Sequence, residues 1–137
     1  MYNRYLITGS TGFLGRAIIE KLVRRNVRVD ALVLRNDPYA ALLPEEVHTV
    51  IGDVCEDDSL ERFFADADNN TCVIHCAGII SVASRSGSKL YQVNIGGTCK
   101  VVRQCLEHHI GKMIYVSSVH AIPEKPKNCV ITEDCEF

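Results

Sequence analysis

The chain has 137 residues, of which 47% are hydrophobic and 23% are charged. This is the size of one ordinary domain, and the composition excludes a disordered, collagen-like or coiled-coil chain. The 15 basic and 17 acidic residues give a net charge of -2 and are spread along the sequence, so no basic block predicts binding to nucleic acid or to an anionic membrane.

Apolar runs and helical periods alternate along the chain. The predicted strands are Arg4–Thr8, Val27–Leu34, Val47–Ile51, Thr71–Ala77 and Lys112–Val116. The predicted helices run from Phe13 to Val23, from Tyr39 to Leu43, onward from Asp57, and from Ser88 to His109 with an interruption at Gly96–Gly97. This alternation predicts an α/β fold, a Rossmann-type doubly wound parallel sheet of five strands in the order 3-2-1-4-5. We expect this domain to occupy residues 1–122, followed by a loop-like tail over 123–137.

No run approaches the roughly 20 apolar residues of a membrane span, and the N-terminus leads into a strand-like run rather than a signal peptide. We therefore expect a soluble, cytoplasmic protein. The seven cysteines are odd in number and form no Cys-x-x-Cys pair, which predicts free, mostly buried thiols. We expect no metal site, because the strand alternation directs Cys72 and Cys76 to one face and His75 to the other.

The glycines of Thr8–Gly15 (Thr-Gly-Ser-Thr-Gly-Phe-Leu-Gly) lie between the first predicted strand and the first helix. Glycines at this place allow a sharp turn, a close approach of the backbone to a pyrophosphate, and tight packing of the helix on the sheet. The free N–H groups at the helix start then face the phosphates. Because no Lys-Ser/Thr pair follows the last glycine, the motif is not a P-loop, and it predicts dinucleotide binding.

The end of the second strand bears on the choice between NAD and NADP. An acidic residue there would accept a hydrogen bond from the ribose 2′-hydroxyl of NAD, whereas this chain has Arg35. A guanidinium suits a 2′-phosphate, so Arg35 favours NADP. Two alternatives stay open: Arg35 is a solvated side chain at a strand end, or Asp37 reaches the ribose instead.

Four further motifs follow the later strands or lie in the long helix. They are Gly52-Asp53-Val54, His75-Cys76-Ala77-Gly78, Val93-Asn94-Ile95-Gly96-Gly97-Thr98 and Tyr115-Val116-Ser117-Ser118. Together with the glycine turn they resemble the extended short-chain dehydrogenase/reductases, the group of NAD(P)-dependent sugar-nucleotide epimerases, dehydratases and related reductases. The resemblance covers nearly the whole chain.

The resemblance implies a role for each matching position. It implies cofactor contacts by Gly9, Thr11, Gly12, Phe13, Leu14, Gly15, Asp53, Val54, Cys76, Ala77, Gly78, Asn94 and Ser117. The Asp53 carboxylate is expected to accept a hydrogen bond from the adenine amine. Ser118 matches the catalytic hydroxyl that helps to polarise the substrate carbonyl or alcohol, although a Ser-Ser pair after a strand also serves as a cap.

The chain departs from the family in one respect. Relatives use a Tyr-x-x-x-Lys pair as the general acid/base, and none of the five tyrosines here is followed by lysine at that spacing. In relatives this pair lies beyond the Ser-Ser motif, and a C-terminal part there builds most of the substrate pocket. We therefore expect a sequence cut short before that part, inactive as it stands.

Two functions agree with these residues. The first is the NAD(P)-binding portion of an epimerase, dehydratase or carbonyl reductase that acts on a sugar nucleotide or a small carbonyl or alcohol. The alternative is a non-catalytic module of the same fold that senses NAD(P). The expected partners are a small-molecule substrate and a second copy of the full-length protein through its long helices, and no nucleic acid or membrane.

Overall fold

A computed structural model of the chain describes residues 2–80, 87–118, 121–123 and 126–135. One parallel sheet, with strand order β3-β2-β1-β4-β5, forms its centre. The strands are β1 (Arg4–Thr8), β2 (Arg28–Val33), β3 (His48–Ile51), β4 (Thr71–His75) and β5 (Lys112–Tyr115). The predicted order 3-2-1-4-5 and the Rossmann-type topology are therefore confirmed.

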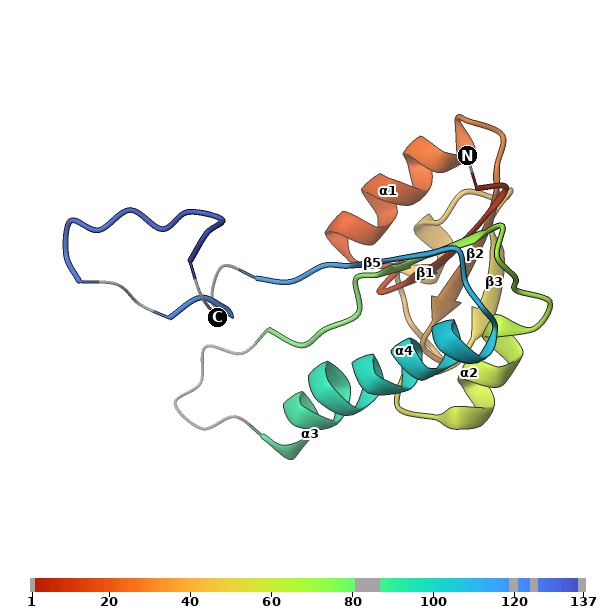
Figure 1. Ribbon diagram of the computed structural model, residues 1–137. Coiled ribbons are helices and arrows are strands. Elements are labelled where there is room, and N and C mark those ends of the chain that lie inside the picture. The colour runs from red at the N-terminus through yellow and green to blue at the C-terminus, as the bar shows by residue number, and fades with distance from the viewer. Residues whose placement is uncertain (1, 81–86, 119–120, 124–125, 136–137) are drawn as a thin grey trace.

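Helices cover both faces of the sheet (Figure 1). Helix α1 (Phe13–Val23) lies on one face, and α2 (Asp57–Phe64) and α4 (Thr98–Glu107) lie on the other. Alternate residues of β1 enter the two cores: Ile7 packs in the cluster that contains Ile19 of α1, and Leu6 packs in the cluster that contains Phe63 of α2. Both faces of the central strands are buried, as is usual for a parallel sheet. The predicted short helix after β2 is a single 3-10 turn, η1 (Ala40–Leu42).

The long helix before β5 differs from the expectation. It consists of α3 (Ser88–Tyr91), the π-helical segment η2 (Gln92–Gly97) and α4, without a break. The predicted interruption at Gly96–Gly97 is therefore wrong: the helix continues through both glycines, and only its geometry changes after them, from π-helical to α-helical. A Cβ atom at Gly97 would lie 2.7 Å from Val54 Cγ2, so glycine is what lets this helix approach the residues that follow β3.

A buried ion cluster holds the amino ends of the first three strands. The Asp30 carboxylate, with no solvent exposure, accepts a hydrogen bond from Arg4 Nε at 2.8 Å and from Arg28 Nε at 3.1 Å, and it lies 2.6 Å from His48 Nδ1. Arg4 also donates to the Ala65 carbonyl that follows α2, at 3.0 Å. Burial raises the pKa of Asp30, but the hydrogen bonds from Arg4, Arg28 and His48 outweigh it and lower that pKa below 3.8.

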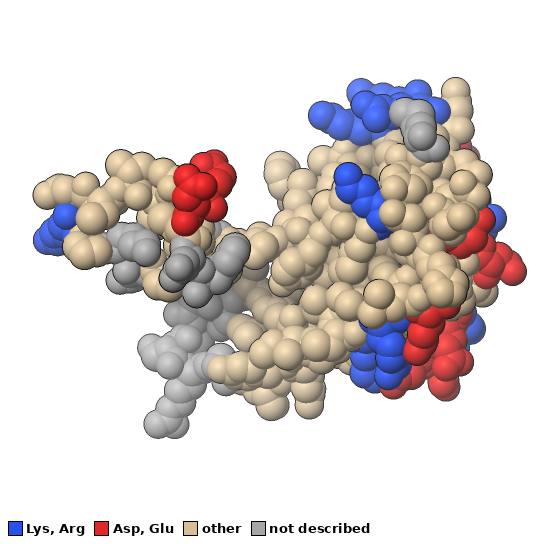
Figure 2. All heavy atoms as spheres, viewed as in Figure 1, with Lys and Arg blue, Asp and Glu red and all other residues tan. Residues whose placement is uncertain are grey.

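Charged side chains of both signs occupy separate small groups on the visible surface (Figure 2). On the outer face of α2 and α4, Asp57 pairs with Lys100 and Arg103. No helix in the described residues is long and apolar enough to cross a membrane. The seven cysteines, which all lie in the described residues, form no disulfide. Only Cys72 and Cys105 are buried, so the expectation of mostly buried thiols is wrong.

Beyond β5 the chain leaves the sheet and extends away from it (Figure 1). Residues 121–123 and 126–135 contain no strand and no α-helix. The proposed division of the chain near residue 122 stays a prediction.

Candidate functional site

A cleft of about 280 Å³ opens at the carboxyl ends of β1, β2, β3 and β4. Its lining residues are Gly9, Thr11, Leu32, Leu34, Asp37, Gly52, Asp53, Val54, Ala77, Gly78, Ile79, Lys89 and Val93. The fold thus brings together three predicted motifs that are far apart in the sequence: the glycine turn, Asp53–Val54 and Ala77–Gly78. This edge of an open parallel sheet, where the strand order reverses, is the usual place for a ligand.

The glycine turn fits closely between β1 and β4. Gly9 has a positive φ of 65°, and a Cβ atom on it would lie 2.6 Å from the Ala77 nitrogen. A Cβ atom on Gly15 would lie 2.2 Å from the Gly9 carbonyl oxygen, so the start of α1 can approach the turn only with glycine there. Gly12 caps α1 without a side-chain hydrogen bond, and no acidic residue stands in the first turn. The positive end of the helix is therefore left to a ligand.

Side chains of the turn anchor it to the end of β2. Ser10 Oγ donates to the Leu32 carbonyl at 2.6 Å, and Thr11 Oγ1 donates to Asp37 Oδ2 at 2.7 Å. The other oxygen of Asp37 accepts from the Tyr39 backbone N–H at 2.9 Å. Asp37 thus faces the cleft with both carboxylate oxygens already hydrogen-bonded within the protein.

His75 connects three elements beneath the cleft. Its Nδ1 lies 2.6 Å from Thr8 Oγ1, its Nε2 lies 2.9 Å from Thr98 Oγ1, and Thr8 Oγ1 accepts from the Ala77 N–H at 3.3 Å. The ring is fully buried and stacks on Tyr115 at a centroid distance of 5.7 Å. Burial lowers the pKa of His75 to about 4, so the ring is neutral at pH 7 and can both donate and accept. This network fixes the backbone after β4, which forms the floor of the cleft.

Asn94 holds the next part of the same floor. Its Oδ1 accepts from the Ile79 N–H at 2.7 Å, and its Nδ2 donates to the Ile79 carbonyl at 2.9 Å. Asn94 lies in the π-helical segment, and such segments often occur at functional sites. The structure therefore places the Asn94 side chain against the cleft backbone, where it positions Gly78 and Ile79.

On the opposite wall, Asp53 Oδ1 accepts from the Cys55 N–H at 2.9 Å. This bond fixes the turn after β3, and Asp53 remains half exposed to the cleft. Val54 is buried beneath it. The arrangement offers a carboxylate beside an apolar wall, which suits a planar base with an exocyclic amine.

Several predicted residues lie outside the lining. The side chains of Phe13 and Leu14 are exposed, Cys76 packs against the core under α1, and Arg35 lines a neighbouring hollow. Ser117 and Ser118 are exposed after β5, on the side of the sheet where the cleft opens.

Sequence reasoning assigned no cofactor contact to six of the lining residues, which are Leu32, Leu34, Gly52, Ile79, Lys89 and Val93. Ile79 follows the Ala77–Gly78 motif directly, so extending that motif by one residue would have found it. Lys89 stands in the first turn of the long helix, and no motif marks it.

No group of three or more His, Cys, Asp or Glu side chains among the described residues is placed to hold a metal ion. Cys72 and Cys76 pack on the α1 side of the sheet, while His75 bonds to Thr98 on the α4 side. The predicted alternation of these three residues is confirmed.

Known proteins share this sequence pattern and this fold. Residues 6–136 match the 3-beta hydroxysteroid dehydrogenase/isomerase family. The chain is 29% identical over 130 residues to human 3 beta-hydroxysteroid dehydrogenase type 7, which covers 90% of this chain and 34% of that protein. It is 31% identical over 119 residues to the mouse short-chain dehydrogenase/reductase family 42E member 1, covering 85% of this chain and 30% of that protein. The chain thus spans about a third of the length of the curated relatives it matches.

Among solved structures, a UDP-glucose 4-epimerase from Thermus thermophilus in complex with NAD superposes with a TM-score of 0.81. The match covers 95% of this chain and 42% of that one, at 24% sequence identity. At this identity the likeness shows the fold alone.

Proposed function

Because the chain belongs to the 3-beta hydroxysteroid dehydrogenase/isomerase family, we propose that it is the NAD(P)-binding part of an oxidoreductase. Family membership confirms the resemblance to the extended short-chain dehydrogenase/reductases. The observation that carries the proposal is the single cleft that unites the glycine turn, Asp53 and Ala77–Gly78.

The residues of the cleft suit a dinucleotide. The start of α1, which has no side-chain cap, and the turn at Gly9–Gly12 would hold the pyrophosphate. Asp53 and Val54 would hold the adenine, and the small residues Ala77 and Gly78 leave room for the cofactor over β4. When bound, the nicotinamide supplies the hydride acceptor or donor.

For the whole protein we propose oxidation of a secondary alcohol or reduction of the matching ketone. The names of the sequence relatives, among them hydroxysteroid dehydrogenases, support this reaction over epimerisation of a sugar nucleotide. Ser118 would donate a hydrogen bond to the reacting oxygen. A hydroxyl is too weak an acid to move the proton by itself, and no Tyr-x-x-x-Lys pair occurs in these 137 residues. We therefore assign proton transfer to a group outside them.

Ser118→Ala in the full-length protein is expected to lower kcat at least about tenfold, because a hydrogen bond to the reacting oxygen is lost in the transition state. Cofactor affinity should stay unchanged. Steady-state kinetics, followed by the absorbance of the reduced nicotinamide, measure both values. A full-length protein that binds NAD(P), has no Tyr-x-x-x-Lys pair and turns over no alcohol or ketone would instead support the NAD(P)-sensing function.

We further propose that NADP is preferred over NAD. Asp37, the acidic alternative, already accepts hydrogen bonds from Thr11 and Tyr39, whereas the exposed Arg35 has no hydrogen-bond partner among the described residues. Arg35→Ala is expected to lower the ratio of NADP to NAD affinity about tenfold. Calorimetric titration of both cofactors measures the ratio. An unchanged ratio would remove Arg35 from the 2′-phosphate site.

A further inference from the structure

His75, the last residue of β4, is a buried side chain to which the proposed function assigns no role. Its Nδ1 lies 2.6 Å from Thr8 Oγ1, which also accepts from the Ala77 N–H at 3.3 Å, and its Nε2 lies 2.9 Å from Thr98 Oγ1. Thr8 ends β1 and Thr98 begins α4, so one chain of hydrogen bonds joins two strands and the long helix. The ring has no solvent exposure and does not line the cleft. His75 can therefore act on a ligand only through its neighbours.

Only one arrangement of protons satisfies this chain of hydrogen bonds. The ring is neutral at pH 7, because burial lowers the pKa of His75, so one ring nitrogen donates and the other accepts. Thr8 Oγ1 already accepts from Ala77, and among the described residues its own hydroxyl hydrogen has no acceptor other than His75 Nδ1. The ring proton therefore lies on Nε2 and is donated to Thr98 Oγ1. The other tautomer would leave a buried hydroxyl hydrogen without an acceptor, which is costly.

His75 also supports the segment that follows β5. Tyr115, which lies opposite His75 in the parallel pairing of β4 and β5, stacks on the His75 ring at a centroid distance of 5.7 Å. The Val116 N–H donates to the His75 carbonyl at 3.0 Å. Ser118, the residue proposed to contact the reacting oxygen, follows two residues later. The ring and the backbone of His75 thus set where the chain leaves the sheet towards Ser118.

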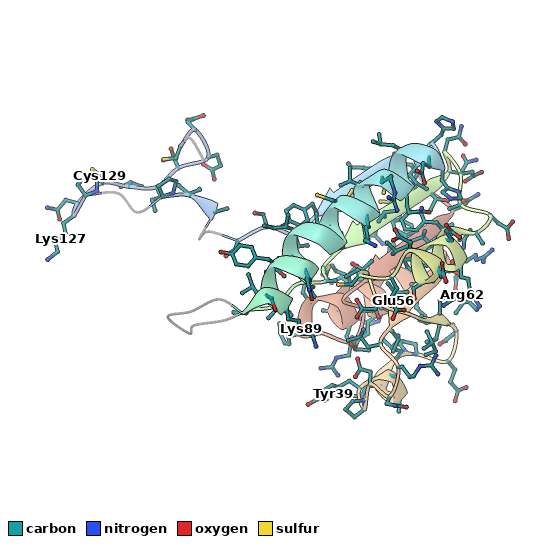
Figure 3. All side chains as sticks on the ribbon, turned by 90° about the horizontal axis from the view of Figure 1, so that it is seen from below. Tyr39, Glu56, Arg62, Lys89, Lys127 and Cys129 are labelled. Atoms are coloured by element: carbon teal, nitrogen blue, oxygen red, sulfur yellow. The ribbon has the colours of Figure 1, made fainter. Side chains whose placement is uncertain are left out.

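The bond to Thr98 helps to place the long helix. Figure 3 shows the helix of α3, η2 and α4 lying along the sheet, with Lys89 at its start. One turn before Thr98, the Asn94 side chain bonds to the backbone N–H and carbonyl of Ile79. These two anchors are four residues apart on the helix, and their partners His75 and Ile79 are four residues apart on the chain after β4. The helix and the floor of the cleft are therefore held in one relative position.

We propose that His75 is a positioning residue for the redox reaction, which in one tautomer holds the cofactor floor at Ala77 and the Ser118 segment in a fixed relative position. This inference rests on the proposed function, because it requires a nicotinamide cofactor over Ala77 and a reacting oxygen at Ser118. A misplacement of about 1 Å can lower the rate of an enzyme about 100-fold. The Thr8 side of the ring governs cofactor affinity, and the Tyr115 side governs the rate at saturating cofactor.

The tautomer is tested without any ligand. ¹⁵N NMR spectra of histidine-labelled protein at pH 7 distinguish a protonated from an unprotonated ring nitrogen, and the spectrum of His75→Asn identifies the His75 signals by their absence. We expect the ring proton on Nε2. A proton on Nδ1, or a mixture of the two tautomers, would overturn the proposed arrangement.

Two substitutions separate the two sides of the ring. Thr8→Val keeps the shape of the side chain but removes the acceptor of the Ala77 N–H, so we expect the dissociation constants of NAD and NADP to rise about five- to tenfold in calorimetric titrations. Thr8→Ser keeps the hydroxyl and should restore most of that affinity. His75→Asn keeps an acceptor bonded to Cγ, as Nδ1 is, but loses the stacked ring and the bond to Thr98. In the full-length protein it is expected to lower kcat about tenfold, with cofactor affinity close to the wild-type value.

The outcomes separate this inference from the proposed function. If the full-length wild type binds NAD(P) and turns over an alcohol or ketone, but Thr8→Val retains its affinity or His75→Asn retains its kcat, the positioning role is wrong and the proposed function stands. Equal losses of affinity and kcat in both variants would show a general loss of structure and would also overturn it. A wild type that binds neither dinucleotide contradicts the proposed function and this inference with it. Circular dichroism establishes that each variant is folded, and if His75→Asn is not, the tautomer and the two Thr8 variants decide.

Discussion

Gly12→Val is expected to abolish binding of both NAD and NADP while the domain stays folded. The backbone at Gly12 has φ of -70° and ψ of 168°, a conformation open to any residue, and a Cβ atom would meet only the Gly9 carbonyl oxygen, at 3.3 Å. The branched side chain would instead occupy the space in which the pyrophosphate approaches the start of α1. We expect the dissociation constants to rise more than about 100-fold in calorimetric titrations. Loss of glycine as the helix cap should cost about 1 kcal/mol of unfolding free energy.

Gly96→Ala provides the matched control. A Cβ atom at Gly96 meets no heavy atom within 4 Å, so this substitution adds a methyl group to a helix without touching the cleft. Its cofactor affinity should equal that of the wild type. If Gly12→Val retains cofactor affinity, the glycine turn does not hold the pyrophosphate and the proposed function loses its main support.

The sheet could be predicted from the sequence because residues that are close together in the chain indicate each strand. Each strand is a short apolar run, and the glycine turn identifies β1 as the central strand from which the others wind outward. The boundaries of β1 and α1 follow directly from Gly9 and Gly12. In contrast, the continuous helix through Gly96–Gly97 was not predictable from local preference. The cost of glycine in a helix is about 1 kcal/mol. The reason for glycine at position 97 is the close approach to Val54, which lies far away in the sequence.

The sequence motifs of the site were predictable, whereas the other residues that line the cleft were not. Gly9, Asp53 and Ala77 each follow a strand, so their meeting at one sheet edge follows from the topology alone. The rest of the lining depends on how α3 presents Lys89, and no spacing in the sequence connects that residue with the motifs.

The ion cluster at the other end of the sheet was also missed. Arg4 and Asp30 stand within apolar runs that are predicted as strands, and both are buried in the structure. A buried charge is costly unless it is paired. Their pairing depends on the register of β1 against β2, in which Arg4 lies opposite Arg28 and Leu6 lies opposite Asp30. That register brings Arg4 and Arg28 to the Asp30 carboxylate, and the register of β2 against β3 places His48 beside it as well.

Arg4→Met is expected to lower the free energy of unfolding by about 3 kcal/mol, because removal of one partner leaves a buried charge poorly compensated. Asp30 would keep only Arg28 and His48, whose side chains are 56% and 64% exposed, and the Ala65 carbonyl would lose its donor. Denaturant unfolding followed by circular dichroism measures the change. Arg103→Met, which breaks an exposed pair with Asp57, should cost less than about 1 kcal/mol.

The double variant Arg4→Met/Asp30→Leu separates an unpaired charge from lost packing. Replacing both partners by apolar side chains is often neutral for stability, so we expect it to recover most of the loss. The two proteins should also differ in acid. The pKa of Asp30 is lowered in the folded state, so its contribution is fully present above about pH 3.8 and is lost as the pH falls below that value through the folded pKa. The wild type should therefore lose more stability below pH 3.8 than the double variant does. Equal acid sensitivity, or a double variant as unstable as Arg4→Met alone, would mean that packing around Arg4, and not its charge, holds the strands together.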